Sequence, residues 1–188
     1  MAQVVHRYEF PERFVAGTVG EPGERTFFVQ ARQGNRLTSV SCEKRQVQVL
    51  ADHLERVLDE LQRLSEGALR IPKAREHADD LDPLDAPLEE DFRAGTMTIA
   101  WDSLLSAVQI ELFSETDDDE PEVIFADERT EGEALEVKIT PTQARDFVAR
   151  ARDLIAAGRP SCPFCGQPLE PAGHICPRSN GYRRALFE

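Results

Sequence analysis

The stretch Thr26-Phe-Phe-Val-Gln-Ala-Arg-Gln-Gly-Asn-Arg-Leu-Thr-Ser-Val-Ser-Cys42 indicates a β-hairpin that leads directly into a long helix. Aromatic and β-branched residues are typical of a strand in the first arm, 26–32, and Gln33-Gly-Asn-Arg36 supplies the turn back into the second arm, 37–42. From about residue 43 to residue 65 apolar residues recur at intervals of three and four, which predicts an amphipathic helix ended by Gly67. On this helix His53 is interpreted as a solvated or satisfied histidine rather than a metal ligand.

A second strand-to-helix stretch follows further along the chain. Segments 123–126 and 135–139 are predicted to form a hairpin, and Thr140-Pro-Thr-Gln143 then combines an N-cap, a proline at the first helical position and a capping box. The predicted helix ends at Gly158. Because a hairpin followed by a helix occurs at 26–65 and again at 123–157, the pattern favours an internal duplication of a β-β-α unit.

The remaining β pattern completes the fold prediction. Segments 4–10 and 14–19 alternate weakly, and 96–101 and 104–113 flank the turn residues Asp102-Ser103. The glycine-rich run 16–25 is interpreted as a hairpin turn rather than a phosphate loop, because a strand and not a helix follows it. We expect an α+β domain over residues 1–158, with antiparallel hairpins packed on two long helices, and a small zinc-ribbon-like module over 159–188.

The charge of this 188-residue chain is unevenly distributed, although its net value is −13. Residues 1–70 balance, residues 71–140 hold five basic and twenty-one acidic side chains, and residues 141–188 hold seven basic and four acidic ones. The acidic segment, residues 72–91, buries few apolar groups, so we predict a loosely packed and dispensable linker; its leucines could instead pack on the core as a short helical turn. The acidic run 114–122 favours a solvated loop over a calcium site, because it lacks the EF-hand pattern.

Residues 162–176 contain three of the four cysteines and one of the four histidines. Cys-Pro-Phe-Cys-Gly and Gly-His-Ile-Cys-Pro give the spacing Cys-x2-Cys, eight residues, His-x-Cys. This Cys3His set is typical of tetrahedral structural zinc. A redox interpretation is weaker, because no strand–helix unit surrounds the first pair as a thioredoxin-like motif requires. We predict that zinc is bound by Cys162, Cys165, His174 and Cys176.

Composition limits the location and the partners. No apolar run approaches the roughly 20 residues of a membrane span, and Cys42 has no partner for a disulfide once the other cysteines bind metal. We therefore expect a cytoplasmic protein that does not bind membranes. The acidic surplus also argues against duplex DNA, which needs a positive surface.

A basic cluster follows the last cysteine and is a candidate ligand site. Arginine binds carboxylate or phosphate through two parallel hydrogen bonds, and tyrosine offers a ring face for stacking. The cluster would suit a nucleotide, a phosphorylated group or a short single-stranded nucleic acid; alternatively, its arginines pair with the acidic segment. The candidate residues are Arg178, Asn180, Tyr182, Arg183 and Arg184.

Two functional classes remain open. The first is a zinc-containing binding or adaptor protein, in which the sheet and the zinc tail form one recognition surface for a protein, the favoured partner, or for a phosphorylated ligand. The second is a hydrolase or nucleotide-acting enzyme that uses carboxylates near the tail arginines. The binding class is favoured, because four protein ligands close a zinc site and no catalytic motif is present in the sequence.

One resemblance is carried by Phe14-Val-Ala-Gly-Thr-Val-Gly-Glu-Pro-Gly-Glu-Arg-Thr-Phe-Phe-Val-Gln-Ala-Arg together with Cys-Pro-Phe-Cys-Gly…Gly-His-Ile-Cys-Pro-Arg-Ser-Asn-Gly-Tyr-Arg-Arg. These runs resemble a family of uncharacterised proteins common in actinobacteria. The likeness covers nearly the whole chain and departs mainly in the acidic linkers. It implies a stable two-part architecture and no particular activity.

Overall fold

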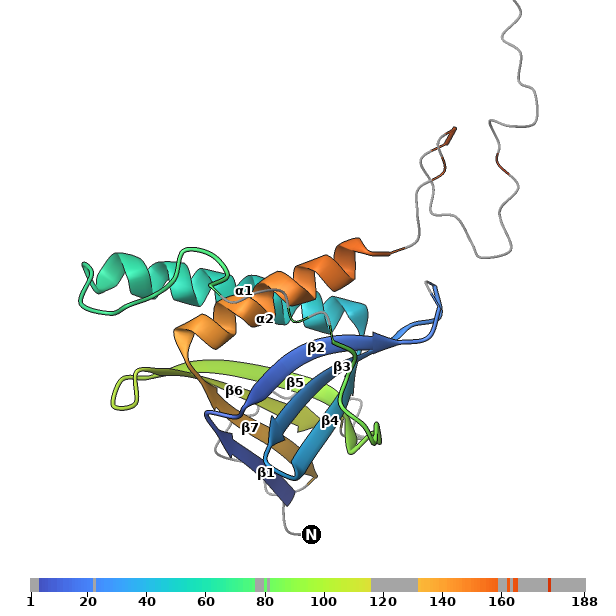
Figure 1. Ribbon diagram of the computed structural model, residues 1–188, viewed down its shortest axis with the longest axis horizontal. Helices are drawn as coiled ribbons and strands as arrows, with labels where there is room; N and C mark the ends of the chain where they lie inside the picture. Colours follow the sequence, from blue (N-terminus) through green and yellow to red (C-terminus); the bar gives the residue numbers. More distant parts are fainter. Residues whose placement is uncertain are drawn as a thin grey trace, which may run out of the picture.

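A seven-stranded sheet carries two helices in the computed structural model (Figure 1). The structure describes residues 4–21, 23–76, 80, 82–115, 132–158, 162, 164, 165 and 176. In chain order its elements are β1 (Val4–Glu9), β2 (Arg13–Val19), β3 (Thr26–Gln33), β4 (Arg36–Cys42), α1 (Lys44–Leu64), β5 (Phe92–Asp102), β6 (Ala107–Ser114), β7 (Glu133–Ile139) and α2 (Pro141–Ala156). The predicted α+β class is therefore confirmed.

The strand order β1-β7-β6-β5-β4-β3-β2 makes the sheet mixed. Strands β2 to β4 and strands β5 to β7 are each joined to their neighbours by antiparallel pairs. The two sets meet through a short parallel pairing of Val40 with Phe92 and Ser41 with Arg93. Strand β1 adds a second parallel pair alongside β7. Antiparallel hairpins thus build each half, and parallel pairing joins them.

The predicted hairpins at β3–β4 and β5–β6 are confirmed, and the glycine-rich run forms the end of β2 and continues into the turn between β2 and β3. Gly20 and Gly34 take φ values of 100° and 58°, which glycine adopts without steric cost. The third predicted hairpin differs. Segment 123–126 lies outside the described residues, and the neighbours of β7 in the sheet are β6 and β1.

Both helices begin at a capping box. The sequence predicts the one at α2, and Gln46 completes the one at α1. Glu43 and Thr140 are the N-caps, and their backbone N–H groups donate to Gln46 and Gln143 at 2.7 and 3.0 Å. The helices lie side by side on one side of the sheet (Figure 1). Their apolar faces meet inward-facing strand residues in one core, in which the largest fully buried side chains include Phe147, Leu50, Leu54, Leu58, Ile110, Leu112, Leu135 and Ile139.

The order of elements repeats: three antiparallel strands followed by a helix occur at 13–64 and again at 92–156. The repeat is one strand longer than the predicted β-β-α unit. Equivalent helix positions are 97 residues apart, the difference between N-caps 140 and 43. The two capping-box glutamines make similar contacts. Gln143 donates to the carbonyl of Pro11, just before β2, and Gln46 donates to the carbonyl of Ala94, near the start of β5.

The acidic segment is not the loosely packed linker that its composition suggests. Its described residues 80 and 82–85 cross the outer edge of β2, the last strand in the sheet order. The Asp85 backbone N–H donates to Gln30 Oε1 at 2.7 Å, and Gln30 Nε2 donates to the Asp85 carbonyl at 3.1 Å. Leu84 packs against Gly17, and residues 82–85 form no helix. Covering an edge strand in this way also blocks unwanted strand pairing.

Candidate functional site

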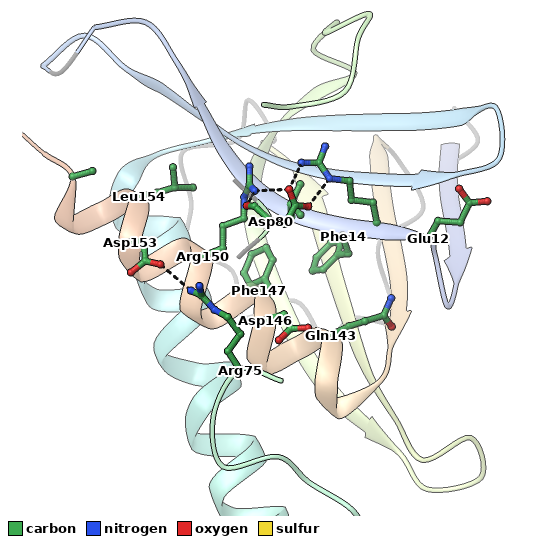
Figure 2. A pocket seen from close by; sticks show the side chains of 13 residues that line it. Glu12, Phe14, Arg75, Asp80, Gln143, Asp146, Phe147, Arg150, Asp153 and Leu154 are labelled. Carbon is green, nitrogen blue, oxygen red and sulfur yellow. Dashed lines mark hydrogen bonds and ion pairs between the residues drawn. The ribbon is translucent and has the colours of Figure 1, made fainter. Parts of the chain in front are cut away.

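A cleft of about 620 Å³ lies between α2 and the edge strand β2 (Figure 2). Its apolar lining includes Phe14 and Phe147, whose rings stack with centroids 4.9 Å apart, together with Leu154 and Ala157. Helix α2 supplies Leu154 from the face that also packs on the core. This volume lies within the roughly 300–1,000 Å³ typical of small-molecule sites, and no motif in the sequence indicates the cleft.

Two guanidinium groups meet one carboxylate at the side of this cleft (Figure 2). Arg13 binds Asp80 through two parallel hydrogen bonds, from Nε to Oδ2 at 2.7 Å and from Nη2 to Oδ1 at 2.9 Å. Arg150 donates from Nη1 to Asp80 Oδ1 at 3.0 Å. These hydrogen bonds, first that from Arg13, lower the pKa of the Asp80 carboxyl below its usual range, and they raise the pKa of Arg13. The arrangement is that of a carboxylate bound by two arginines.

The arginines are more deeply buried than the carboxylate between them. The side chains of Arg13 and Arg150 are 11% and 13% exposed, whereas that of Asp80 is 38% exposed. Both guanidiniums are thus largely shielded from water, whereas solvent reaches the carboxylate. Arg150 also donates to the Ala16 carbonyl of β2 at 2.7 Å, which joins α2 to the sheet edge.

Another ion pair lies across the cleft from this group. Arg75 Nη2 lies 2.8 Å from Asp153 Oδ2, and the Glu76 backbone N–H donates to Asp146 Oδ1 at 3.3 Å. The acidic segment therefore contacts helix α2 at Asp146, Arg150 and Asp153. Acidic and basic side chains surround the apolar floor, and the cleft suits a ligand that has both an apolar and a charged part.

The structural repeat produces a second cleft of about 620 Å³ between α1 and β5. Its four helix residues, Val49, Leu50, His53 and Val57, stand 97 positions before Asp146, Phe147, Arg150 and Leu154, which line the first cleft. His53, an exposed helix histidine as predicted, takes the place of Arg150. The fold therefore forms the α1–β5 cleft with a histidine at this helix position, and only the α2–β2 cleft has an arginine there.

The three cysteines of the predicted metal site lie together. The Sγ atoms of Cys162, Cys165 and Cys176 are within 4.8 Å of one another, and Cys162 Sγ lies 3.7 Å from Cys176 Sγ. Burial raises the pKa of the Cys162 thiol, but hydrogen bonds from the backbone N–H groups of Cys165 and Phe164 and from the neighbouring thiols outweigh it, so the net pKa is lowered. Three clustered thiols can bind a soft or borderline metal ion. The fourth predicted ligand, His174, lies outside the described residues.

The predicted basic cluster also lies outside the part of the chain that the structure describes. This holds for each of its members, Arg178, Asn180, Tyr182, Arg183 and Arg184. The proposed alternative, an enzyme using carboxylates near these arginines, depends on the same residues. In contrast, no motif in the sequence indicates the arginines at the α2–β2 cleft, because Arg13 and Arg150 are 137 positions apart and their shared partner, Asp80, is distant from both.

Comparison with known proteins gives a family and no activity. The family model described as a protein of unknown function, DUF3090, matches residues 6–176. Neither a search of curated proteins nor a search of solved structures finds a match. No helix among the described residues is both long and apolar enough to cross a membrane.

Proposed function

The chain belongs to the DUF3090 family, and we propose that it is a zinc-containing binding protein whose α2–β2 cleft recognises a phosphate or carboxylate group on a ligand with an apolar body. The observation that carries this proposal is the pair of buried guanidiniums, Arg13 and Arg150, which bind one partly exposed carboxylate beside an apolar floor. Paired arginines recognise planar carboxylates and phosphate oxygens with defined geometry.

The sequence predicts a protein or a phosphorylated ligand, and the cleft supports a small ligand with an anionic group over a protein partner. A stable protein interface covers about 800 Å² on each partner and is broad, whereas small-ligand sites are concave and mostly apolar with a few polar groups. The α2–β2 cleft has the second form: Phe14, Phe147 and Leu154 line it, and the charged groups stand beside them.

The metal site is proposed to be structural zinc bound by Cys162, Cys165, Cys176 and His174. The clustered thiols support three of these ligands, and the Cys-x2-Cys and His-x-Cys spacing supports the fourth. Only five positions separate Ala157, at the edge of the cleft, from Cys162, so the extended chain could place their Cα atoms at most about 18 Å apart. Metal binding would thereby hold Cys162 within that distance of the cleft edge, which supports a shared recognition surface.

The fluorescent probe 8-anilinonaphthalene-1-sulfonate tests the cleft, because it joins an apolar body to one anionic group. We expect the wild-type chain to bind it, and 4-phenylbutyrate to compete at least about tenfold better than the neutral 4-phenylbutanamide, since hydrogen bonds to charged groups contribute about 1.5–3 kcal/mol. Leu154→Asp should abolish this binding. The matched variant Val57→Asp, at the equivalent position of the α1–β5 cleft, should leave it unchanged.

Two results would contradict the proposed function. Equal competition by the carboxylate and the amide would show that the arginines do not contribute to recognition. Loss of probe binding in Val57→Asp but not in Leu154→Asp would place the ligand in the other cleft. Thermal melting of both variants checks that each has retained its fold.

A further inference from the structure

We infer that the Asp80 carboxylate is an internal competitor, which occupies the anion site of Arg13 and Arg150 until the phosphate or carboxylate of a ligand replaces it. This inference rests on the proposed function and adds its regulation: the chain binds its own carboxylate where the ligand's anionic group would bind. The displaced group is a carboxylate, which accepts two parallel hydrogen bonds from Arg13. We therefore expect the ligand's anionic group to offer a similar pair of acceptor oxygens.

The first support is that the carboxylate can leave without releasing its segment. Arg13 also donates to the backbone carbonyls of Asp82 and Pro83, each at 3.0 Å, and to the Asp85 carboxylate at 2.8 Å. Arg150 donates to the carbonyls of Ala16 and Asp82, both at 2.7 Å, and to that of Asp80. These contacts keep the segment on β2 whatever the conformation of the Asp80 side chain.

The second support is accessibility. Asp80 is exposed to solvent over 38% of its side chain, about three times the fraction of either arginine. An incoming anion can therefore reach the position of the carboxylate, while the guanidiniums remain fixed by backbone carbonyl acceptors. A preorganised pair of donors loses little conformational entropy when one acceptor replaces another.

The third support comes from the repeat. At the position equivalent to Arg150 the α1–β5 cleft has His53, and that cleft has the same volume. A structural arrangement required by the fold would be expected in both halves. The arginine is present only where the acidic segment supplies a carboxylate, so we interpret the two as a matched anion site and its occupant.

The test compares Asp80→Asn with Asp82→Asn, which removes the same charge two positions away on the same segment. Both arginines donate to the backbone carbonyl of Asp82, which the substitution keeps. Asp80→Asn should lower the Kd for 4-phenylbutyrate by about tenfold, because the apparent Kd is the intrinsic Kd divided by the fraction of time the site is free, and a carboxylate that occupies the site about nine-tenths of the time raises it by about that factor. Asp82→Asn should change the Kd less than about twofold, the size expected for an exposed charge screened by salt. The neutral 4-phenylbutanamide should bind all three proteins equally.

If both variants bind 4-phenylbutyrate more tightly by the same factor, the effect comes from net charge alone and the inference is overturned. Weaker binding by Asp80→Asn would overturn it as well. If Asp80→Asn fails to fold, a crystal structure of the wild-type chain with phenyl phosphate decides the question. The inference requires phosphate oxygens on Arg13 Nη2 and Arg150 Nη1, with the Asp80 carboxylate displaced. A phosphate bound elsewhere in the cleft, with the Asp80 pair intact, would refute the inference alone; no binding to the cleft in any variant would refute the proposed function.

Discussion

Gly17 of β2 lies directly beneath Leu84 of the acidic segment: a Cβ atom added at position 17 would be 2.4 Å from Leu84 Cδ2 and 2.5 Å from Leu84 Cγ. The strand and the segment fit together because position 17 has no side chain. By the alternation of a strand, Gly17 faces away from Phe14 and Ala16, which pack in the core under the helices. The acidic segment therefore covers the opposite face of the sheet at this edge.

This contact predicts that Gly17→Ala destabilises the chain through the acidic segment. Overpacking typically costs about 1–3 kcal/mol, and we expect that range in the free energy of unfolding from urea titration. Adding Leu84→Ala should recover most of the loss, because the shortened side chain makes room for the new methyl group. Additive losses in the double variant would show that the two residues do not interact.

Gln30 provides a second prediction, because it is a buried polar residue that links β3 to the acidic segment. Its side chain is 1% exposed, donates to Ser39 Oγ at 3.0 Å and exchanges two hydrogen bonds with the Asp85 backbone. Gln30→Met keeps the shape but leaves the buried Ser39 hydroxyl without this partner, at about 1–3 kcal/mol, whereas the two backbone groups of Asp85 are only partly buried, so water replaces the lost contacts there at a smaller cost. We expect a total loss of about 2–4 kcal/mol in urea unfolding.

The control for this substitution is Gln33→Met on the same strand. Gln33 donates to the Glu9 carbonyl at 3.1 Å from an exposed position, where water can replace the lost contact. Its loss should stay below about 0.5 kcal/mol, as is usual for surface substitutions. Similar losses at positions 30 and 33 would contradict the proposed role of the acidic segment as a packed element.

Local signals explain why so much of the secondary structure was predictable. The capping box of Thr140 and Gln143 involves residues three apart, and the turn at Gly34 depends on a conformation that glycine favours. Such features are specified within a few residues. The same holds for the spacing of the cysteines, which predicts the clustering of Cys162, Cys165 and Cys176 that the structure confirms.

Contacts between distant segments could not be predicted in the same way. Gln30 and Asp85 are 55 positions apart, and Arg13 and Asp80 are 67 apart. On one sequence Gln30 looks like the solvent-facing residue of a half-buried strand, and an acidic run looks solvated. Only the fold shows that the acidic segment covers Gln30. For this reason the structure predicts that deleting residues 76–86 destabilises the chain, where composition alone suggests a dispensable linker.

Cys42 gives a prediction about reactivity and pH. Burial raises the pKa of its thiol from 9.0 to about 12, so at pH 8 the reactive thiolate is about a thousandfold rarer than for an unperturbed thiol. Alkylation by iodoacetamide at pH 8, followed by peptide mapping, should label Cys42 rapidly in urea and at least about a hundredfold more slowly in the folded chain. Comparable rates in both states would show that Cys42 is accessible.

The same shift fixes the sign of a pH effect on stability. The neutral thiol is favoured in the folded state, so this contribution is fully present below pH 9 and is lost as the pH rises toward 12. The expected loss is about 1.4 kcal/mol for each pH unit in that window. Cys42→Ala should remove this pH dependence above pH 9, although the missing sulfur lowers stability at every pH. A wild-type stability that is flat from pH 9 to pH 11 would contradict the raised pKa.

The last prediction concerns the metal site. We expect about one zinc per purified chain by elemental analysis, bound by Cys162, Cys165, Cys176 and His174. Cys165→Ser should reduce the zinc content to near zero, because structural zinc is bound with about 10–16 kcal/mol through deprotonated ligands, and the loss of one thiolate opens the set. His174→Ala should have the same effect, which tests the ligand that lies outside the described residues. Cys42→Ala is the control and should keep the metal. In Cys165→Ser we expect limited proteolysis to begin after Ala157, while residues 1–158 keep their melting temperature, since none of the three described cysteine ligands belongs to the core of the helices and the sheet. An iron-loaded chain, or zinc retained by both ligand variants, would require a different metal site.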